Sequence, residues 1–597
     1  MAASEIGPAT APGSSRADYV ELMLRARTDD DMLTLASRFI LDEFDVYYSE
    51  SRAIPTLAKQ AFEQREPARS VALSRRRLAI YGESIHAIAA RLKRVYPLLS
   101  RDEGLWETIE GRYLPLVRGR YEEDLALAYV NSVRRVIFED EWQPVDYSFG
   151  VAGREGAIDP CAVLRRFEPP LTPDRIGQIL RSAGFETPFR DLEADAALAS
   201  TRLAAEFDGA DVAAVEMVEA AFFRNRGAYL VGRASLANGE ARPLVFALEN
   251  GKSGVTLDAV LTREAEVHNL FSTTLANFHV TDARYHELAA FLKTLMPRRP
   301  LGLHYSGIGF NHVGKVAVMQ ELAGELAATG EKIATAAGFR GTVAVGFSAP
   351  SSAYVLKVIR DTPAAGYKWG SFAGIEAVLE KYRQVHEINR TGSMLDNMIY
   401  RRVRLPLAWF DPRLALELLA AASRTVSLVG KHLVFRHLIA QPKMIPLPIY
   451  LATASREQAE TAMLSLGACI KNNAAGGVFN KDLDARNYGV SRFGKVYLFD
   501  YDAVEPLVDV KIRTNLGRED GEEDVPDWVF EDGVIFLPEE IEAGFMLDDR
   551  ALRRVFRAAH GDLLTTGYWE GMQRALRRGW VPKAEVYPDE TRLRREP

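Results

Sequence analysis

The sequence predicts an α+β protein: a mainly helical N-terminal domain with a β-hairpin insertion, followed by a two-lobed α+β domain. Apolar residues recur at helical spacing over 19–40 and again over 74–98, which predicts long amphipathic helices. Two apolar, β-prone runs flank Asn238-Gly239, the strongest short-range signal for a hairpin. Beyond the proline- and arginine-rich segment 297–302, glycine turns, strands and helices alternate.

Composition excludes several classes of protein. The chain has 597 residues, enough for two or three domains, and its 47% apolar fraction excludes a mainly disordered or fibrous chain. It has 81 acidic and 74 basic residues, a net charge of −7, which disfavours a dedicated nucleic-acid-binding protein. Two cysteines, Cys161 and Cys469, cannot build a disulfide scaffold. With no secretory signal and no long apolar window, we expect a soluble, cytoplasmic protein that binds no membrane.

The N-terminal part is expected to be a tail and one helical domain. Residues 1–16, rich in Ala, Ser, Gly and Pro, predict a disordered tail. The helical domain is assigned to residues 17–310, with further helices over 120–134 and 174–206. The predicted hairpin strands, 228–236 and 244–248, interrupt it.

The second domain is assigned to residues 311–597, with an N-lobe at about 311–446 and a C-lobe at about 447–597. Its periodicity predicts strands, then a helix, then a long helix, then short extended segments and a polar loop. The expected strands are 336–347, 353–359, 443–451 and 494–501, and the expected helices are 371–389 and 411–438.

Two segments imitate a P-loop, G-x-x-x-x-G-K-[ST], and we interpret both as ordinary turns. Gly309 to Lys315 fits until Val316, which has no hydroxyl for a magnesium ion. Gly251-Lys252-Ser253 has the right ending, but Phe246 stands where the first glycine belongs.

A glycine loop and a strand lysine predict a site for nucleotide phosphates. Glycines let backbone N–H groups approach phosphate oxygens, and Lys357 follows Gly341 by 16 residues within an apolar strand. A protein kinase carries its phosphate-binding lysine at such a place. The ion-pair partner of Lys357 is expected on the next helix, with Glu376 and Glu380 as open alternatives. The loop comprises Ala336, Ala337, Gly338, Phe339, Arg340, Gly341 and Thr342.

Two acidic loops complete a kinase-like order. Asp482 is followed by Asn487 at the spacing of a kinase catalytic loop, where the Asp aims the attacking hydroxyl and the Asn holds magnesium. Asp500 follows an apolar strand 18 residues later, in Phe499-Asp-Tyr-Asp502, and suits the second magnesium ligand. Each signal is weak alone, but together they predict a two-lobed protein-kinase-like domain.

These residues lie within longer stretches that resemble bacterial isocitrate dehydrogenase kinase/phosphatase, from about Phe44 to Arg577. A generic kinase has neither of the first two stretches. The segments that carry the resemblance are Arg226–Gly232, Gly309–Lys315, Tyr354–Asp361, Arg436–Leu438 with Met444–Leu447, and Arg486–Val490 with Phe499–Asp502.

The resemblance implies a regulatory domain before the kinase-like domain, and one ATP-dependent site that phosphorylates a serine of isocitrate dehydrogenase and removes that phosphate. This would control carbon flux between the tricarboxylic acid cycle and the glyoxylate bypass. It implies ATP/ADP and Mg²⁺ as cofactors, AMP and other metabolites as effectors, and a homodimer as one state to consider. The adenine hinge would fall near Leu447 to Tyr450, and Asp396 would belong to the active site.

The implied site residues extend those found from the motifs. Catalytic roles fall on Asp396, Asp482, Asn487, Asp500 and Asp502, metal binding on Asn487 and Asp500, and nucleotide binding on the glycine loop and Lys357. Either Asp396 or Asp502 would orient the water that attacks phosphoserine. The chain departs from the family pattern at Arg486, at Ala503 and at Asn480-Lys481. A small-molecule kinase of the aminoglycoside-kinase type and a nucleotide-sensing pseudokinase are the alternatives.

Overall fold

The computed structural model describes residues 18–138, 158–208, 210–271, 278–336, 338, 341–364, 372–388, 392–516, 532–581 and 586–593. These residues form two compact units, each described by itself. The first contains residues 18–51 and 79–138, and the second contains the other described residues. None of the described helices has both the length and the apolar character that a membrane crossing requires.

The first unit is helical, as the periodicity predicts. Its core contains an aromatic cluster in which the Tyr129 ring lies 5.5 Å from Phe44 and 5.7 Å from both Tyr47 and Tyr81, measured between centroids. Residues of the unit come from α1 (Tyr19–Leu24), α2 (Asp29–Glu63), α3 (Pro67–Val95), η1 (Pro97–Ser100), α4 (Glu103–Val117) and α5 (Glu123–Ile137).

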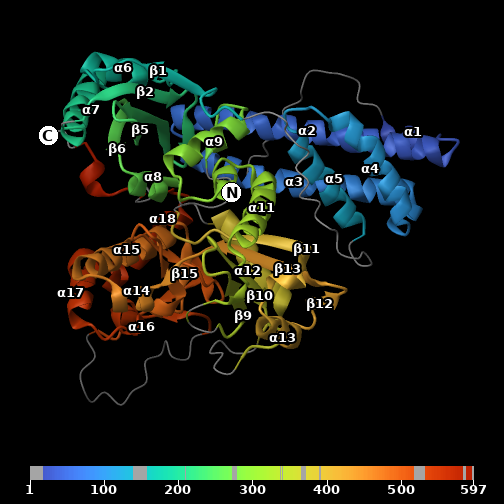
Figure 1. Ribbon diagram of the computed structural model, residues 1–597. Helices are drawn as coiled ribbons and strands as arrows, with labels where there is room; N and C mark the ends of the chain where they lie inside the picture. Colours follow the sequence, from blue (N-terminus) through green and yellow to red (C-terminus); the bar gives the residue numbers. More distant parts are fainter. Residues whose placement is uncertain are drawn as a thin grey trace. The chain divides into compact units, whose positions relative to one another are not determined.

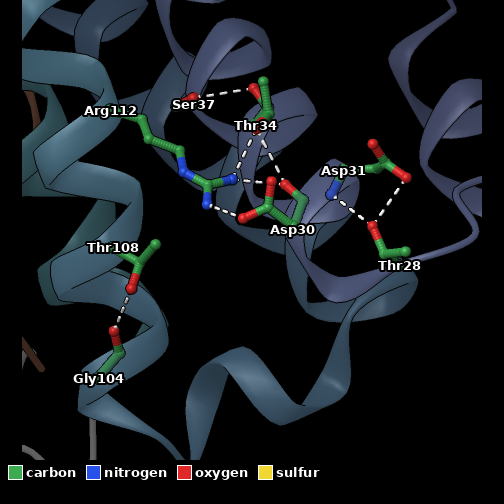
Figure 2. A network of polar contacts seen from close by, with 8 residues as sticks. All are labelled: Thr28, Asp30, Asp31, Thr34, Ser37, Gly104, Thr108 and Arg112. Carbon is green, nitrogen blue, oxygen red and sulfur yellow. Dashed lines mark hydrogen bonds and ion pairs between the residues drawn. The ribbon is translucent and has the colours of Figure 1, made fainter.

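A polar network ties α4 to the start of α2 in this unit. Figure 2 shows the Arg112 guanidinium directed at Asp30 and Thr34. One guanidinium nitrogen donates to the Thr34 hydroxyl over 2.6 Å, and the other contacts the Asp30 carboxylate. Asp30 also lies in the acidic first turn of α2, where a negative charge is favourable.

The N-terminal part of the second unit contains a seven-stranded sheet. The predicted hairpin is confirmed as β4 and β5, with Val231 opposite Val245, but it belongs to a sheet of strand order β1-β2-β4-β3-β7, with β5 and β6 continuing from β4. The other strands lack a clean alternation of apolar and polar residues, and β1, β3 and β7 are also short, so the sequence concealed them. The elements are β1 (Leu164–Phe167), α6 (Pro173–Arg181), α7 (Leu192–Glu206), β2 (Val212–Val218), β3 (Phe222–Arg224), β4 (Gly227–Leu236), β5 (Ala241–Gly251), β6 (Gly254–Leu261), α8 (Glu264–Phe271), β7 (His279–Val280), α9 (Tyr285–Leu295), α10 (Leu301–Gly307) and α11 (Asn311–Thr329).

The first P-loop look-alike is the junction between α10 and α11. A Cβ on Gly314 would lie 2.5 Å from the Gly302 carbonyl oxygen, and one on Gly302 would lie 2.7 Å from that of Gly314. The two helices therefore cross with backbones in contact, which only glycine permits. Gly309 has φ +90°, and a Cβ there would overlap the buried Arg77 guanidinium. These glycines serve helix packing.

The kinase-like part begins with an antiparallel sheet of strand order β11-β13-β10-β9-β8, and β12 pairs with β13. Its core includes Leu303, Val318 and Leu322 of the preceding helices. Figure 1 labels strands β9 to β13 beside α12 and α13. The elements are β8 (Ala334–Thr335), β9 (Ala344–Ser348), β10 (Tyr354–Ile359), α12 (Ile375–Ile388), β11 (Met398–Pro406), η2 (Leu407–Trp409), α13 (Pro412–Ala421), β12 (Val426–Val429) and β13 (His432–Pro442).

The long helix predicted over 411–438 is wrong. Only α13 is helical, and the rest forms a hairpin in which Val429 pairs with His432 across Gly430-Lys431. Gly430 has φ +58°, which suits a two-residue hairpin loop. The continuous apolar run hid the change from helix to strand, although its β-branched residues and Gly430 were available signals.

The second lobe is built around the central helix α15 and a buried core that includes Leu466, Phe479 and Trp569. The strand predicted over 443–451 is mostly helical, because only Ile445–Pro446 pairs before α14 begins. Figure 1 labels the helices α14 to α18. The elements are β14 (Ile445–Pro446), α14 (Leu447–Thr453), α15 (Arg456–Ala475), β15 (Val478–Asn480), η3 (Ala485–Asn487), β16 (Tyr488–Val490), β17 (Val496–Leu498), β18 (Val504–Pro506), η4 (Leu507–Asp509), β19 (Lys511–Ile512), β20 (Ile535–Phe536), η6 (Pro538–Glu540), α16 (Ile541–Gly544), α17 (Arg550–His560), η7 (Gly561–Leu564), α18 (Thr566–Arg577) and η8 (Asp589–Thr591).

The C-terminal segment returns to the first sheet of this unit. Arg592 forms an antiparallel bridge with Ala259 of β6. Its guanidinium lies 2.6 Å from the Asp258 carboxylate, which also accepts the Tyr587 hydroxyl at 2.5 Å. Arg202 of α7 donates to the Glu590 carbonyl over 3.1 Å. This segment joins the end of the chain to the seven-stranded sheet.

The glycine crossing of α10 and α11 predicts a strong position effect within one helix. Gly314→Ala should lower the stability by roughly 1–3 kcal/mol, because the new methyl group overlaps the facing backbone. Gly324→Ala, in the same helix with nothing near its Cβ, should leave the stability unchanged or raise it by up to about 1 kcal/mol. Thermal unfolding of the two purified variants measures both effects. Equal melting temperatures would contradict the close crossing.

Candidate active site

A cavity of about 420 Å³ lies between the two lobes of the kinase-like part. Residues of β9 and β10 line it on one side, and the loops around β15 to β18 line it on the other. The predicted site residues among its lining are Ala336, Gly341, Thr342, Lys357, Asp482, Asn487, Asp500 and Asp502.

The glycine loop is described in part. Ala337, Phe339 and Arg340 lie outside the described residues. Gly338 has φ +128°, and a Cβ there would be 3.4 Å from Pro446, which lines the cavity. Gly341 also has no room for a side chain, because a Cβ would lie 2.7 Å from the Ala344 carbonyl oxygen.

Two short strand pairs bring the acidic loops together. β15 pairs with β18, and β16 pairs with β17, both antiparallel. The Phe499 N–H donates to the Asn487 carbonyl over 3.1 Å, and the Lys481 N–H donates to the Ala503 carbonyl over 3.0 Å. Each acidic loop is flanked by strands that pair with the strands flanking the other loop, so the two loops lie side by side.

Side-chain amides hold the catalytic loop in shape. The side-chain nitrogen of Asn480 donates to the Asp482 backbone carbonyl over 2.6 Å, and its side-chain oxygen accepts from the Asp482 N–H over 3.2 Å. The Asn487 amide also donates to the Asp482 carbonyl, over 3.2 Å. Asn480, which looked like a departure from the family pattern, thus orients the backbone of Asp482. The Asn487 side-chain oxygen stays available at the cavity.

An ion pair with the buried Asp484 places Arg486 at the cavity. The Asp484 carboxylate, almost fully buried, accepts the Arg486 guanidinium at 2.6 Å and also the Arg486 N–H at 2.9 Å. The bond to Asp484 raises the pKa of Arg486. Arg486 is half exposed and lines the cavity, so it brings a fixed positive charge to the site.

The second acidic loop places two carboxylates close together. The Asp502 N–H donates to the Asp500 carboxylate over 3.4 Å. Burial, and then the neighbouring Asp500 charge, raise the pKa of Asp502 to about 7. Lys381 of α12 donates to the Asp502 carbonyl, so this helix contacts the loop.

Lys357 lies at the centre of the cavity wall. It is paired in the sheet with Gly346 on one side and Ile439 on the other, and its side chain is half-buried at the cavity. Burial lowers its pKa, while the charges of Asp500 and Asp502 act in the opposite direction. Its hydrogen bond, to the Phe499 carbonyl, is long at 3.4 Å.

The helix glutamate expected to pair with Lys357 does not do so. Glu376 and Glu380 are exposed and contact Arg383 at 3.3 and 2.6 Å. Glu376 also lies 3.1 Å from His437. No carboxylate lies within ion-pair distance of Lys357 among the described residues. The helix instead presents Tyr382, a buried residue of the cavity lining that no sequence motif singles out.

Asp396 lies apart from the other predicted residues. It lines a second, smaller cavity of about 60 Å³, with Arg299 at 3.9 Å. Burial raises the pKa of Asp396 to about 6, against the opposing charge of Arg299 and Lys495. Burial also lowers the pKa of Lys495, to about 7. The structure therefore places Asp396 in a buried charge cluster outside the 420 Å³ cavity.

The segment that connects the lobes lines the cavity at residues that precede the expected hinge in the sequence. Gln441, Pro442, Met444 and Pro446 line it, whereas Leu447 to Tyr450 belong to α14. Apolar and proline residues at this edge suit the flat face of an adenine ring.

Two family models match adjacent parts of the chain. Residues 37–330 match the regulatory domain of isocitrate dehydrogenase kinase/phosphatase (AceK), and residues 331–589 match the kinase domain of the same family. The chain belongs to the isocitrate dehydrogenase kinase/phosphatase family. This confirms the resemblance that the sequence suggested, and the α+β arrangement of a helical regulatory domain and a kinase-like domain.

Full-length relatives support the same assignment. Isocitrate dehydrogenase kinase/phosphatase of Rhodopseudomonas palustris (strain TIE-1) is 49% identical over 607 residues, covering 100% of this chain and 98% of that protein. The protein of the same name from Anaeromyxobacter sp. (strain Fw109-5) is 33% identical over 575 residues, covering 94% of this chain and 98% of that protein. Membership of a kinase/phosphatase family implies the use of ATP.

The observed contacts of α12 predict that its glutamates are dispensable for nucleotide binding. Glu380→Gln should leave the KM for ATP within about twofold, because an exposed ion pair contributes about 0–1 kcal/mol. Steady-state ATP kinetics on the variant measure this. A tenfold or larger rise in KM would show that the glutamate pairs with Lys357 during turnover.

Proposed function

We propose that this protein is an ATP-dependent serine kinase of isocitrate dehydrogenase that also removes the phosphate, with both reactions in the cavity between the lobes. One observation carries the proposal. In a chain of this family, a single cavity collects Lys357, Asp482, Asn487 and Asp500 in the arrangement that phosphoryl transfer requires. The family match over both domains favours this function over a small-molecule kinase or a pseudokinase.

The nucleotide phosphates would bind at the β9–β10 side of the cavity. Gly341 and Thr342 offer backbone N–H groups there, and Lys357 of β10 brings a positive charge to the same cavity. Arg486 adds a second cation from the opposite loop, held by Asp484. Phosphoryl transfer depends on positioning and on charge neutralisation, and these groups supply both.

Magnesium fits the oxygen donors at the junction of the two loops. The Asn487 side-chain nitrogen donates to the Asp482 carbonyl, so its side-chain oxygen is not part of that hydrogen bond. Asn487 and Asp500 line the same cavity. Mg²⁺ prefers oxygen ligands and takes the rest of its shell from phosphates and water. When bound, it neutralises charge on the phosphate oxygens.

Asp482 would aim the serine hydroxyl of isocitrate dehydrogenase at the γ-phosphate. Its backbone is held on both sides by Asn480, and its carboxylate accepts a long hydrogen bond from the Asp484 N–H at 3.4 Å. The carboxylate can then accept the serine proton as the phosphate transfers.

For the reverse task, we propose that Asp502 orients the water that attacks phosphoserine. Of the two alternatives from the sequence, Asp502 lines the catalytic cavity, whereas Asp396 lines the smaller one. A group that orients a water must lie within hydrogen-bond reach of the reacting phosphate. Asp396 would then act on stability, by neutralising Arg299 and Lys495.

The wider role follows from the substrate. Phosphorylation of isocitrate dehydrogenase would direct carbon into the glyoxylate bypass, and dephosphorylation would restore the tricarboxylic acid cycle. We assign AMP and other metabolites, as effectors, to the regulatory domain at residues 37–330.

Removing the aligning carboxylate should abolish phosphorylation. Asp482→Ala should lower the kinase kcat at least about 100-fold, with nucleotide binding preserved, because the group acts on the attacking hydroxyl. The assay follows labelled phosphate from ATP into purified isocitrate dehydrogenase with Mg²⁺, then its loss in a chase with ADP and unlabelled ATP. A wild-type protein that transfers no label would overturn the proposed function.

Asp502 and Asp396 should behave differently when their charges are removed. Asp502→Asn should lower label release at least about 100-fold while the melting temperature changes little. Asp396→Asn should lower stability by about 3–5 kcal/mol, since it leaves buried cations uncompensated, and both activities should fall together. Selective loss of phosphatase activity in a stably folded Asp396→Asn protein would reverse the assignment.

A further inference from the structure

Lys357 has an unusual environment for a phosphate-binding lysine. Its side chain is half-buried at the cavity wall, and no carboxylate lies within ion-pair distance of its ammonium among the described residues. Two aromatic faces are close instead. The nitrogen lies 5.1 Å from the centroid of the Phe499 ring and 5.9 Å from that of the Tyr382 ring. An ammonium at such distances is attracted by the negative face of the ring.

The Tyr382 ring is held firmly. It is 2% exposed and packs edge-on against Tyr501, with centroids 4.9 Å apart and planes at 73°. The Tyr501 hydroxyl donates to the Leu395 carbonyl, and the Asn397 amide donates to the Tyr382 carbonyl over 3.3 Å. Both the ring and its backbone are therefore positioned by the segment that precedes β11.

Helix α12 meets the active site through two adjacent residues. Tyr382 faces Lys357, and Lys381 donates to the Asp502 carbonyl. Glu376 contacts Arg383 and His437, and Glu380 contacts Arg383. The contacts of this helix with the cavity are thus aromatic and cationic.

Charge balance explains why a ring suits this place. The cavity already contains the carboxylates of Asp482, Asp500 and Asp502, and it must accept a polyphosphate. Glu417 lines the cavity as well, paired with Arg360. A glutamate beside Lys357 would add a further negative charge and compete with the phosphates for the ammonium. A ring orients the ammonium without a formal charge.

We propose that Tyr382 is the positioning residue of Lys357, and that its aromatic face takes the place of the carboxylate that a kinase helix ordinarily supplies. The proposal rests on the proposed function only in that the cavity binds adenine nucleotide. It does not depend on the identity of the protein substrate. The ring, rather than the hydroxyl, is the part that acts.

A double-mutant cycle on nucleotide affinity tests the coupling. Calorimetric titration with Mg²⁺ and ADP is made on wild type, Tyr382→Leu, Lys357→Met and the double variant. Tyr382→Leu should weaken binding about tenfold in the wild-type background and less than twofold in the Lys357→Met background. Tyr382→Phe should bind within about twofold of wild type. Independent effects that simply multiply would overturn the proposal.

Controls separate positioning from packing. Tyr568→Leu removes a ring of α18 that packs against the same core outside the cavity, and it should lower the melting temperature without changing ADP affinity. If Tyr382→Leu does not fold, loss of binding in Tyr382→Phe overturns the proposal and retained binding supports it. A wild-type protein that binds no ADP would instead defeat the proposed function, whereas wild-type binding with an unaffected, folded Tyr382→Leu defeats only this inference.

Discussion

The catalytic cavity depends on backbone pairing between two pairs of three-residue strands. β15 with β18 and β16 with β17 hold the two acidic loops, and hydrogen bonds from Phe499 to Asn487 and from Lys481 to Ala503 extend that pairing to the loops themselves. Carboxylates repel one another, so they stay close only where the backbone is rigid. The buried core around α15 supplies that rigidity, because β15, β16 and β17 are buried against it.

On the sheet side of the cavity, the ammonium of Lys357 is held close to apolar groups. Lys357 lies opposite Gly346 in the sheet, and both residues line the cavity. Its cost of burial is offset by Asp500 and Asp502 across the cavity and by two aromatic faces. One lobe thus carries the Lys357 ammonium, and the other carries the Asp500 and Asp502 carboxylates whose charges act on it. Bound nucleotide would lie on that axis.

The sequence predicts most of the site, because strand lysines and acid loops leave local signals. Lys357, Asp482, Asn487 and Asp500 all reach one cavity. What it misses depends on tertiary packing. The buried partners of Tyr382 decide which face of α12 meets Lys357. Glu376 and Glu380 lie on the exposed face of this helix. Asp396 sits in a charge cluster whose members, such as Arg299 and Lys495, are nearly a hundred residues away on either side. The apolar run after α13 conceals a hairpin, since continuous burial removes periodicity.

The central claim is that one cavity holds nucleotide, metal and both acid loops. A crystal structure of the protein with Mn²⁺ and a non-hydrolysable ATP analogue, with the metal located by its anomalous scattering, tests it most directly. The account predicts a manganese peak at the Asn487 side-chain oxygen and the Asp500 carboxylate, with the phosphates beside Lys357. A metal and nucleotide bound elsewhere in the chain, with this cavity empty, would contradict it.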